Sequence, residues 1–459
     1  MMITRRQLLQ FPLAAPLAAQ RKLNVLFIAV DDLNTRLGCY GDPVVKSPNI
    51  DRLAARGVRF DSAYCNYPLC NPSRTSLLSG RRPDTTKIHD NTTQPRTYLG
   101  DTVFLPEYFK SHGYFTARVG KIAHGAFEHW VKWDISENAR AGEAVAARDR
   151  TQKDKAGRDR KGGEAMKLTW HPTDNPDEVE PDGHTARRIA KIIEEHKDQP
   201  FFVGAGFHKP HLPWVAPKKY FDMYPPAKIK LPYAPANDRD DIPPIALTRT
   251  AGDDQMTDAD KQQAIAAYHA CTTFTDAQIG VLLDTLDRLK LWDSTIVLLF
   301  GDHGWHLGEH LGLWRKMTLF EESDHAPLIV VAPGMEKGVA SKRLVEFVDI
   351  YPTLAELAGL PKPQGLEGLS LTPLLKDHNR PWKSAIYTWV ARGKDTLGQT
   401  MRTDRYRYTE WGNDQVIEVY DHDKDPKEFT NLARVPGNEK LVAELRQKMR
   451  AGWKASLPR

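Results

Sequence analysis

The chain has 459 residues, of which 41% are hydrophobic and 27% charged, with four cysteines and a net charge of +5. This composition indicates a globular protein with a sizeable core and excludes a disordered, collagen-like or disulfide-scaffold chain. The longest apolar runs, Val25 to Val30 and Thr295 to Phe300, are far shorter than the ~20 residues of a membrane-spanning helix, so we expect no membrane span. The small net charge gives no indication of nucleic-acid binding.

The first twenty residues differ from the rest of the chain. Arg5 and Arg6 precede a short, modestly apolar stretch that ends in small residues near Ala19. This pattern predicts a twin-arginine signal peptide over residues 1–20, and therefore a periplasmic or secreted protein. A frayed basic N-terminus is the alternative interpretation.

Strands and helices alternate along residues 21–365. Apolar runs rich in β-branched residues predict buried strands, at 23–30, 114–119, 201–206, 295–300 and 328–332. Helical patterns bounded by glycine or proline predict helices, at 48–56, 72–78, 103–112, 183–196, 257–289 (broken near 272–273) and 349–358. The alternation predicts an α/β fold with a large, mostly parallel sheet sandwiched between helices.

The pattern changes after residue 365. Short alternating segments predict a small antiparallel sheet, at 386–390, 399–403, 405–410 and 418–421, and a helix follows at 439–454. We therefore expect an α/β domain over 21–365 and a smaller α+β subdomain over 366–459. Within the first of these, Arg140 to Lys167 is a basic insertion that is either a solvated surface loop or a flap over an anionic polymer.

Polar residues follow three of the predicted strands directly. Asp31 and Asp32 follow the first strand, His208 follows the strand at 201–206, and Asp302 and His303 follow the strand at 295–300. Ligands of open α/β sheets bind beyond the carboxyl ends of the strands, so these groups are expected to meet at one edge. Clustered carboxylates need a cation, and oxygen-rich ligands favour Ca²⁺ or Mg²⁺. An isolated Asp-Asp pair, in contrast, is usually a turn or a helix cap.

The most specific motif is Cys70-Asn71-Pro72-Ser73-Arg74-Thr75-Ser76-Leu77-Leu78-Ser79-Gly80-Arg81. It resembles the signature of the formylglycine-dependent (type I) sulfatases of the alkaline phosphatase superfamily. Further similar segments extend along most of the chain, among them Gly38 to Gly41, Ser47 to Asp51, Gly120 to His124, Phe207 to His211 and Asp302 to Trp305. His303 and the His325-Ala326-Pro327 segment favour the iduronate-2-sulfatase branch, whereas Ala123-His124-Gly125 departs from that branch and changes the expected pocket shape.

The resemblance implies a modified residue and a metal. Cys70 is expected to be oxidised to formylglycine (3-oxoalanine) by a formylglycine-generating enzyme. Five residues are expected to hold Ca²⁺: Asp31, Asp32, the modified Cys70, Asp302 and His303. The remaining cysteines, Cys39, Cys65 and Cys271, are expected to be buried thiols, although a Cys39–Cys65 disulfide stays open.

The resemblance also assigns roles in catalysis. One hydroxyl of the hydrated aldehyde at residue 70 attacks sulfur, and Arg74 orients this diol. Lys121 and Lys316 neutralise the sulfate oxygens, with Arg315 as a competing candidate for the second position. His208 protonates the departing alcohol, and His124 removes a proton from the second hydroxyl so that sulfate is expelled.

The expected activity is therefore hydrolysis of sulfate esters on a sulfated carbohydrate. Resemblance to the iduronate-2-sulfatase branch implies a 2-O-sulfated uronic acid at a chain end, whose carboxylate would pair with a cation. Lys209, Arg315 and the insertion from Arg140 to Lys167 are the candidates for this pairing. The alternatives are an arylsulfatase, a phosphonate monoester or phosphodiester hydrolase of the same superfamily, and a non-catalytic glycan-binding protein.

Overall fold

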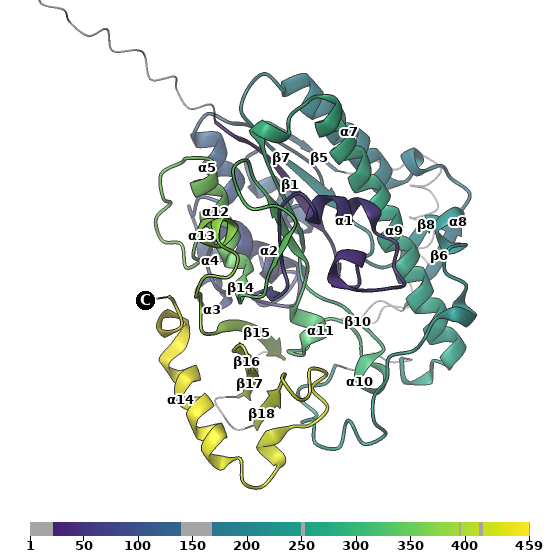
Figure 1. Cartoon of the computed structure of the whole chain (residues 1–459), viewed down its shortest axis with the longest axis vertical. Coiled ribbons are helices and arrows are strands. Elements are labelled where there is room, and N and C mark those ends of the chain that lie inside the picture. The colour runs from purple at the N-terminus through teal and green to yellow at the C-terminus, as the bar shows by residue number, and fades with distance from the viewer. Residues whose placement is uncertain (1–21, 139–167, 249–252, 394–395, 413–415, 459) are drawn as a thin grey trace, which may run out of the picture.

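The computed structural model describes residues 22–138, 168–248, 253–393, 396–412 and 416–458 (Figure 1). The predicted signal peptide over residues 1–20 and the whole basic insertion, Arg140 to Lys167, lie outside the described residues. Among the described residues, no helix is long and apolar enough to cross a membrane.

The core of the molecule is an eight-stranded sheet with the order β13-β2-β12-β9-β1-β7-β4-β5. Its strands are β1 (Asn24–Val30), β2 (Val58–Phe60), β4 (Phe115–Gly120), β5 (Ile135–Glu137), β7 (Phe201–Phe207), β9 (Thr295–Gly301), β12 (Leu328–Val331) and β13 (Val339–Ser341). Strand β1 pairs in parallel with both β7 and β9, and β4 pairs in parallel with β7. All residues of β1, β7 and β9 are buried, as their continuous apolar sequences predict. The prediction of a large, mostly parallel sheet is confirmed.

Strand β12 departs from the parallel pattern because it pairs antiparallel with β9 and with β2. The segment between β9 and β12 contains only short elements, β10 (His306–Leu307), α10 (Glu309–Gly312), β11 (Trp314–Arg315) and α11 (Glu321–Asp324). A parallel strand needs a crossover that carries the chain back to the opposite edge, whereas an antiparallel strand can return directly. The residues between β9 and β12 therefore stay at the edge where β9 ends.

Helices cover both faces of the sheet (Figure 1). The principal helices are α1 (Pro48–Ala54), α2 (Cys70–Ser79), α5 (Leu105–Ser111), α7 (Pro181–His196), α9 (Asp258–Arg288) and α12 (Ile350–Leu357). Alternate residues of β1 divide between two cores: Phe27 packs in the core that contains side chains of α2, α5 and α12, and Ile28 in the core formed with α1, α7 and α9.

Helix α9 is continuous, so the predicted break near residues 272–273 is wrong. The two threonines there satisfy their hydroxyl groups without interrupting the helix. Thr272 Oγ1 donates to the carbonyl of Tyr268 one turn earlier, and Thr273 Oγ1 donates to the carbonyl of Lys46.

The C-terminal part contains an antiparallel sheet of β15 (Ile386–Arg392), β16 (Thr396–Arg402), β17 (Tyr406–Trp411) and β18 (Val416–Asp421). Helix α14 (Glu439–Ala455) packs against this sheet through Leu445 and Met449 and lies at the lower edge of the molecule in Figure 1. The short remaining strands are β3 (Ala63–Tyr64), β6 (Trp170–Thr173), β8 (Trp214–Pro217) and β14 (Val345–Glu346). The short remaining helices are α3 (Pro83–Thr86), α4 (Arg96–Leu99), α8 (Lys218–Phe221) and α13 (Thr372–Lys376).

Candidate active site

The ends of β1 and β9 place two acidic segments side by side. Val30 pairs with Gly301, so Asp31 and Asp32 leave the sheet next to Asp302 and His303. The backbone N–H of Asp32 donates to Asp302 Oδ1 at 3.0 Å. All four side chains are fully buried. The strand register thus brings together the groups that the sequence predicted at one edge of the sheet.

Helix α2 brings the signature motif to the same place. Cys70 is the first residue of α2, and its Sγ lies 3.5 Å from His303 Nε2. Ser73 Oγ donates to the carbonyl of Asp302 at 2.5 Å. Arg74 Nε donates to Asp302 Oδ2 at 2.8 Å, and its Nη2 lies 3.3 Å from Asp31 Oδ1. Arg74 Nη1 donates to the carbonyls of Lys121 and Ile122 at 2.8 and 3.0 Å, so Arg74 fixes α2 both to the acidic strand ends and to the loop after β4.

Two lysines complete the cluster. Lys121, directly after β4, places its Nζ 2.5 Å from Asp31 Oδ2. Lys316 Nζ lies 2.5 Å from Asp32 Oδ1, 3.1 Å from Cys70 Sγ and 5.2 Å from the centre of the Trp305 ring. Burial and the charge of Asp31 act to raise the pKa of the Cys70 thiol, but Lys121 and Lys316 outweigh them and hold it well below its usual value. The site therefore stabilises negative charge on the side chain of residue 70.

Histidines border the cluster on the side of β4 and β7. His208 follows β7, keeps 46% of its side chain exposed, and has Nδ1 3.8 Å from Asp31 Oδ2. Partial desolvation of the imidazole, and then the neighbouring His211, hold the pKa of His208 below its usual value. His124 begins the turn Gly125–Trp130, and its buried Nδ1 has no hydrogen-bond partner among the described residues.

His211 lies closer to the centre of the site than the sequence indicated. Its Nδ1 lies 2.6 Å from the carbonyl oxygen of Leu212, and its Nε2 lies 3.9 Å from Asp32 Oδ2. The rings of His208 and His211 are 5.0 Å apart. The sequence left open whether His211 contacts substrate or shapes the loop, and the geometry supports both.

Two carboxylates that the sequence analysis missed position these loops. Asp182, in the first turn of α7, accepts the backbone N–H groups of His208 and Lys209 at 2.9 and 2.7 Å. Burial raises its pKa to about 6. Its place directly before the predicted helix 183–196 is typical of a capping residue and was the available signal.

The second missed carboxylate is Glu128. It accepts the N–H groups of Ile122 and Ala123 at 2.6 and 2.8 Å and so fixes the chain between Lys121 and His124. No local pattern distinguishes it, because its partners are backbone groups that only the folded loop presents.

Two of the cationic candidates for a uronate, Lys209 and Arg315, are otherwise engaged, and the third, the insertion from Arg140 to Lys167, lies outside the described residues. Lys209 Nζ donates to the carbonyls of Pro213 at 2.5 Å and His211 at 3.3 Å, which stabilises its own loop. Arg315 is largely buried and pairs with Asp253. Lys316, and not Arg315, is the residue that reaches Cys70.

The donor set fits a hard divalent cation. Ligand atoms of Asp31, Cys70, Asp302 and His303 lie within 4.8 Å of one another, and Asp32 forms a similar group with Cys70 and His211. The buried Oδ2 of Asp32 has no hydrogen-bond partner among the described residues. Carboxylate oxygens are the ligands that such ions prefer, and they make up most of this set.

The other cysteines take no part in the site. Cys39, Cys65 and Cys271 are free thiols, so the Cys39–Cys65 disulfide that the sequence left open is not formed in the structure. Cys65 and Cys271 are buried as expected, but Cys39 is only half-buried, because it lies in a short turn at the sheet edge.

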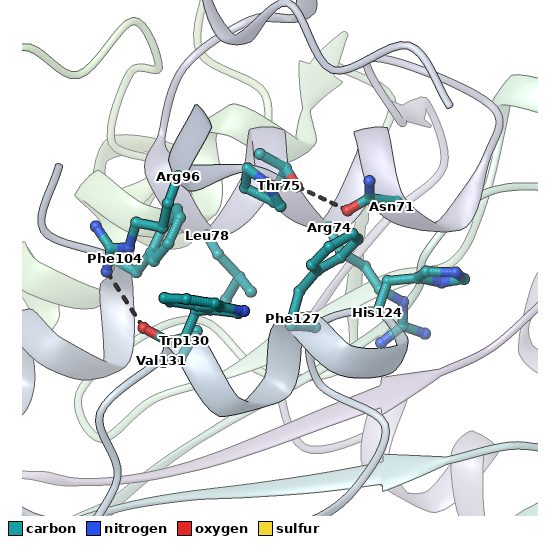
Figure 2. A pocket seen from close by; sticks show the side chains of 12 residues that line it. Asn71, Arg74, Thr75, Leu78, Arg96, Phe104, His124, Phe127, Trp130 and Val131 are labelled. Atoms are coloured by element: carbon teal, nitrogen blue, oxygen red, sulfur yellow. Dashed lines mark hydrogen bonds between the residues drawn. The ribbon is translucent and has the colours of Figure 1, made fainter. Parts of the chain in front are cut away.

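A narrow pocket lies beside α2 (Figure 2). Figure 2 shows Leu78, Phe104, Phe127 and Trp130 surrounding it, while the imidazole of His124 extends away from these apolar side chains. Its volume is about 20 Å³, too small for a sugar ring. The pocket lies between α2 and the turn Gly125–Trp130. Because of its small volume, it is not a substrate site.

The chain belongs to the sulfatase family, whose description "Sulfatase" matches residues 23–360. A second description, "N-sulphoglucosamine sulphohydrolase, C-terminal", matches residues 308–454. It is accordingly an enzyme, a sulfuric ester hydrolase, and the resemblance seen in its sequence is confirmed.

Known proteins with similar sequences are also sulfatases. A "Sulfatase" of Formosa agariphila is 34% identical over 95% of this chain and 88% of its own length. The human "Iduronate 2-sulfatase" is 32% identical over 89% of this chain and 91% of its own length. Among solved structures, the phosphonate monoester hydrolase of Agrobacterium radiobacter has a TM-score of 0.78 at 21% identity, covering 94% of this chain and 95% of that one. The last similarity confirms the fold.

Proposed function

We propose that the enzyme removes a 2-O-sulfate from a uronic acid at the end of a sulfated glycan. The observation that carries this proposal is a pair of cations at residue 70: Lys316 Nζ lies 3.1 Å from Cys70 Sγ, and Lys121 pairs with the neighbouring Asp31. Together they would bind the oxygens of a sulfate group. The similarity to an iduronate 2-sulfatase over nine-tenths of both chains supports the choice of sugar.

We infer that Cys70 is converted to formylglycine by a maturation enzyme. We also infer that Asp31, Asp32, the modified Cys70, Asp302 and His303 hold Ca²⁺. When present, the aldehyde hydrate supplies a nucleophilic oxygen at the start of α2, and Ca²⁺ supplies Lewis acidity that lowers the pKa of a bound hydroxyl. The buried carboxylates and the unbonded Oδ2 of Asp32 support the metal assignment.

The chain's own residues bind sulfate and transfer protons. Lys121 and Lys316 bind the sulfate oxygens. When substrate binds, each lysine gives up part of its ion pair with Asp31 or Asp32 and donates hydrogen bonds to the sulfate instead. Arg74 keeps residue 70 in register with Asp302, so that the reacting atoms meet at a fixed distance.

Proton transfer falls to the two histidines at the edge of the site. His208 is partly exposed and close to Asp31, and its lowered pKa leaves it neutral in the free enzyme. We infer that it takes up a proton when the anionic sulfate ester binds and passes it to the departing alcohol oxygen. His124, held by the loop that Glu128 fixes, accepts a proton as sulfate is released.

The proposed function is tested by comparing substrates at equal chain length. We expect a higher kcat/KM for a 2-O-sulfated uronate disaccharide than for a 6-O-sulfated hexosamine disaccharide. Faster turnover of the 6-O-sulfated sugar would contradict the uronate assignment while leaving the sulfatase intact. A second comparison, of 4-nitrophenyl sulfate with a 4-nitrophenyl phosphodiester, tests the alternative that the enzyme is a phosphonate monoester or phosphodiester hydrolase. We include it because the fold is similar to that of a phosphonate monoester hydrolase.

The metal is tested by chelation. Removing a bound cation leaves the buried carboxylates facing one another, so we expect EGTA to abolish turnover and lower the melting temperature, and Ca²⁺ to restore both. Unchanged activity and melting after exhaustive chelation would show that the cluster is not a metal site.

We also propose that residues 21–365 are the catalytic domain and residues 366–459 a C-terminal subdomain, after a twin-arginine signal peptide of residues 1–20 that directs export. The change from a mostly parallel to an antiparallel sheet supports the boundary. Because twin-arginine export carries folded proteins, oxidation of Cys70 would precede export.

A further inference from the structure

We name the buried cluster around residue 70 the reaction centre; it consists of Asp31, Asp32, Cys70, Asp302, His303, Lys121 and Lys316. A second cavity lies where loops from the reaction centre meet the loop after β18. We name it the rim cavity and define it by six lining residues: Arg36, Tyr233, Glu309, Glu322, Lys427 and Phe429. Its volume is about 280 Å³. This lies near the lower end of small-molecule sites and suits a single pyranose ring of about a dozen non-hydrogen atoms.

The walls of the rim cavity continue the loops that carry the reaction centre. Arg36 lies on the loop that leaves β1 through Asp32, and Glu309 lies on the loop that leaves β9 through Asp302. The N–H of Gly304, the residue after His303, donates to the carbonyl of Ser323, next to Glu322. The cavity and the reaction centre are therefore built on the same two chain segments, so we expect them to lie close together.

An aromatic ring with most of its surface exposed stands at the cavity. The side chain of Tyr233 is 79% exposed, which is high for a large aromatic residue. Phe429 packs against it edge to face at 6.1 Å and so helps fix its orientation. A fixed, exposed aromatic face offers a surface on which the C–H face of a sugar ring can pack.

The far wall is rigid and formed in advance. His310 is buried, stacks on Phe320 at 4.3 Å and hydrogen-bonds Asp238 through Nδ1 at 3.1 Å. His310 and Leu311 both adopt left-handed backbone conformations, with φ of 50° and 57°. Strain of this kind persists where the surrounding contacts enforce it, and it concentrates at ligand sites.

The charges of the cavity lining are paired, including His310, which also lines the cavity and pairs with the buried Asp238. Arg36 Nη2 lies 2.9 Å from Glu309 Oε1, and Lys427 Nζ lies 3.1 Å from Glu322 Oε1. A sulfate or carboxylate bound here would lie beside two carboxylates, which disfavours it. Hydroxyl groups, in contrast, can donate to the carboxylates and accept from the guanidinium and ammonium groups.

We propose that the rim cavity is a subsite for an uncharged, hydroxyl-rich sugar ring of the glycan whose terminal sulfate is removed. This inference rests on the proposed function and adds the ring next to the one that reacts. Tyr233 packs on the face of that ring, and the two ion pairs bind its hydroxyls.

The test compares Tyr233→Ala with the control Tyr98→Ala, which removes another exposed aromatic side chain that is not part of the cavity lining. The substrates are 4-nitrophenyl sulfate and a 2-O-sulfated uronate joined to N-acetylglucosamine. We expect Tyr233→Ala to raise KM for the disaccharide about tenfold and to leave 4-nitrophenyl sulfate unchanged, while Tyr98→Ala changes neither. An unchanged KM for the disaccharide in Tyr233→Ala would overturn the proposal.

A calorimetric titration separates this inference from the proposed function. The unsulfated disaccharide should bind the wild-type enzyme and bind Tyr233→Ala about tenfold more weakly, whether or not the sulfated form is hydrolysed. Equal affinity of the two proteins would overturn the subsite. Equal or tighter binding of a disaccharide with a 6-O-sulfated second ring would overturn its assignment to an uncharged ring. Failure of the proposed function would instead appear as hydrolysis of 4-nitrophenyl sulfate without hydrolysis of the sulfated disaccharide.

Discussion

Two buried networks of charged side chains differ in how completely their oxygen atoms are bonded. One is the reaction centre, with Lys121 and Lys316 on the aspartates after β1. The other, which we name the β14 network, consists of Arg82, Glu346, Asp349 and Lys383 and lies at β14, next to the start of the C-terminal sheet. Both are almost completely buried, so burial alone does not distinguish function from structure.

In the β14 network every carboxylate oxygen has a donor. Glu346 Oε2 accepts from Arg82 Nη2 at 2.6 Å and Lys383 Nζ at 2.8 Å, and its Oε1 accepts the N–H of Tyr387 at 3.0 Å. Both oxygens of Asp349 accept from Lys383 Nζ at 2.7 Å. Burial acts to raise the pKa of Glu346, but Arg82 and Lys383 outweigh it and lower that pKa to about 2.

In the reaction centre the bonding is incomplete. Asp32 Oδ2 and His124 Nδ1 are buried and have no hydrogen-bond partners among the described residues. The side chains of Lys121 and Lys316 are each 12% exposed to solvent, so their ammonium groups can reach a ligand. Arg82 Nε of the β14 network also has no partner among the described residues, so the two networks differ in their carboxylates. The comparison indicates that a buried network whose carboxylate oxygens are all bonded stabilises the fold, whereas one with an unbonded carboxylate oxygen is available for a ligand.

The largest expected effect is on catalysis. Lys316→Ala removes a cation from the position where charge develops on sulfate, so kcat/KM for 4-nitrophenyl sulfate should fall by about 10³-fold. The control Lys342→Ala, an exposed lysine, should leave kcat/KM unchanged. A loss of less than tenfold in Lys316→Ala would show that this lysine does not contact the reacting group.

The β14 network should respond in the opposite way. Lys383→Met leaves two buried carboxylates without their shared cation, which costs about 3–5 kcal/mol of unfolding free energy. The kcat of the folded protein should stay within twofold of wild type. Urea denaturation measures the unfolding free energy, and active-site-normalised kinetics measure kcat. A large fall in kcat with unchanged stability would show that the β14 network serves catalysis and not the stability of the fold.

His269 tests whether every incompletely bonded buried group is functional. It lies in α9, and neither ring nitrogen has a hydrogen-bond partner among the described residues. Burial, and then the charge of Arg36, lower its pKa to about 4. The unfolded chain therefore binds an extra proton between pH 6.5 and 4, and stability is lost as pH falls through that window.

Replacing this imidazole should remove that loss. Between pH 7 and pH 5 the wild type should lose about 2 kcal/mol more stability than His269→Leu, with kcat nearly the same in both. Urea denaturation at the two pH values measures the difference. Equal pH dependence of the two proteins would mean that the ring nitrogens of His269 are hydrogen-bonded in solution. A lower kcat of His269→Leu would mean that this residue of α9 contributes to turnover.

The sequence predicted those site residues that follow directly from a buried strand or belong to the signature motif. Asp31 and Asp302 were found because six or seven apolar residues precede each of them, and Cys70 and Arg74 because the motif is specific. The antiparallel direction of β12 was missed because its apolar sequence is the same for either direction.

Other features depend on contacts between distant segments. Asp182 and Glu128 bond backbone N–H groups of folded loops, and the position of His211 depends on how its loop turns. The continuity of α9 depends on the carbonyl of Lys46, which lies far away in the sequence. No local pattern encodes these partners.

The central claim is that residue 70, at the incompletely bonded network, is converted into the nucleophile. Mass spectrometry of the tryptic peptide Phe60 to Arg74 from active enzyme tests this most directly. We predict a peptide about 18 Da lighter than the unmodified sequence, with fragment ions that place the change at residue 70 and not at Cys65, and an activity that rises with the modified fraction. A fully active preparation whose Cys70 is entirely an unmodified thiol would contradict the account.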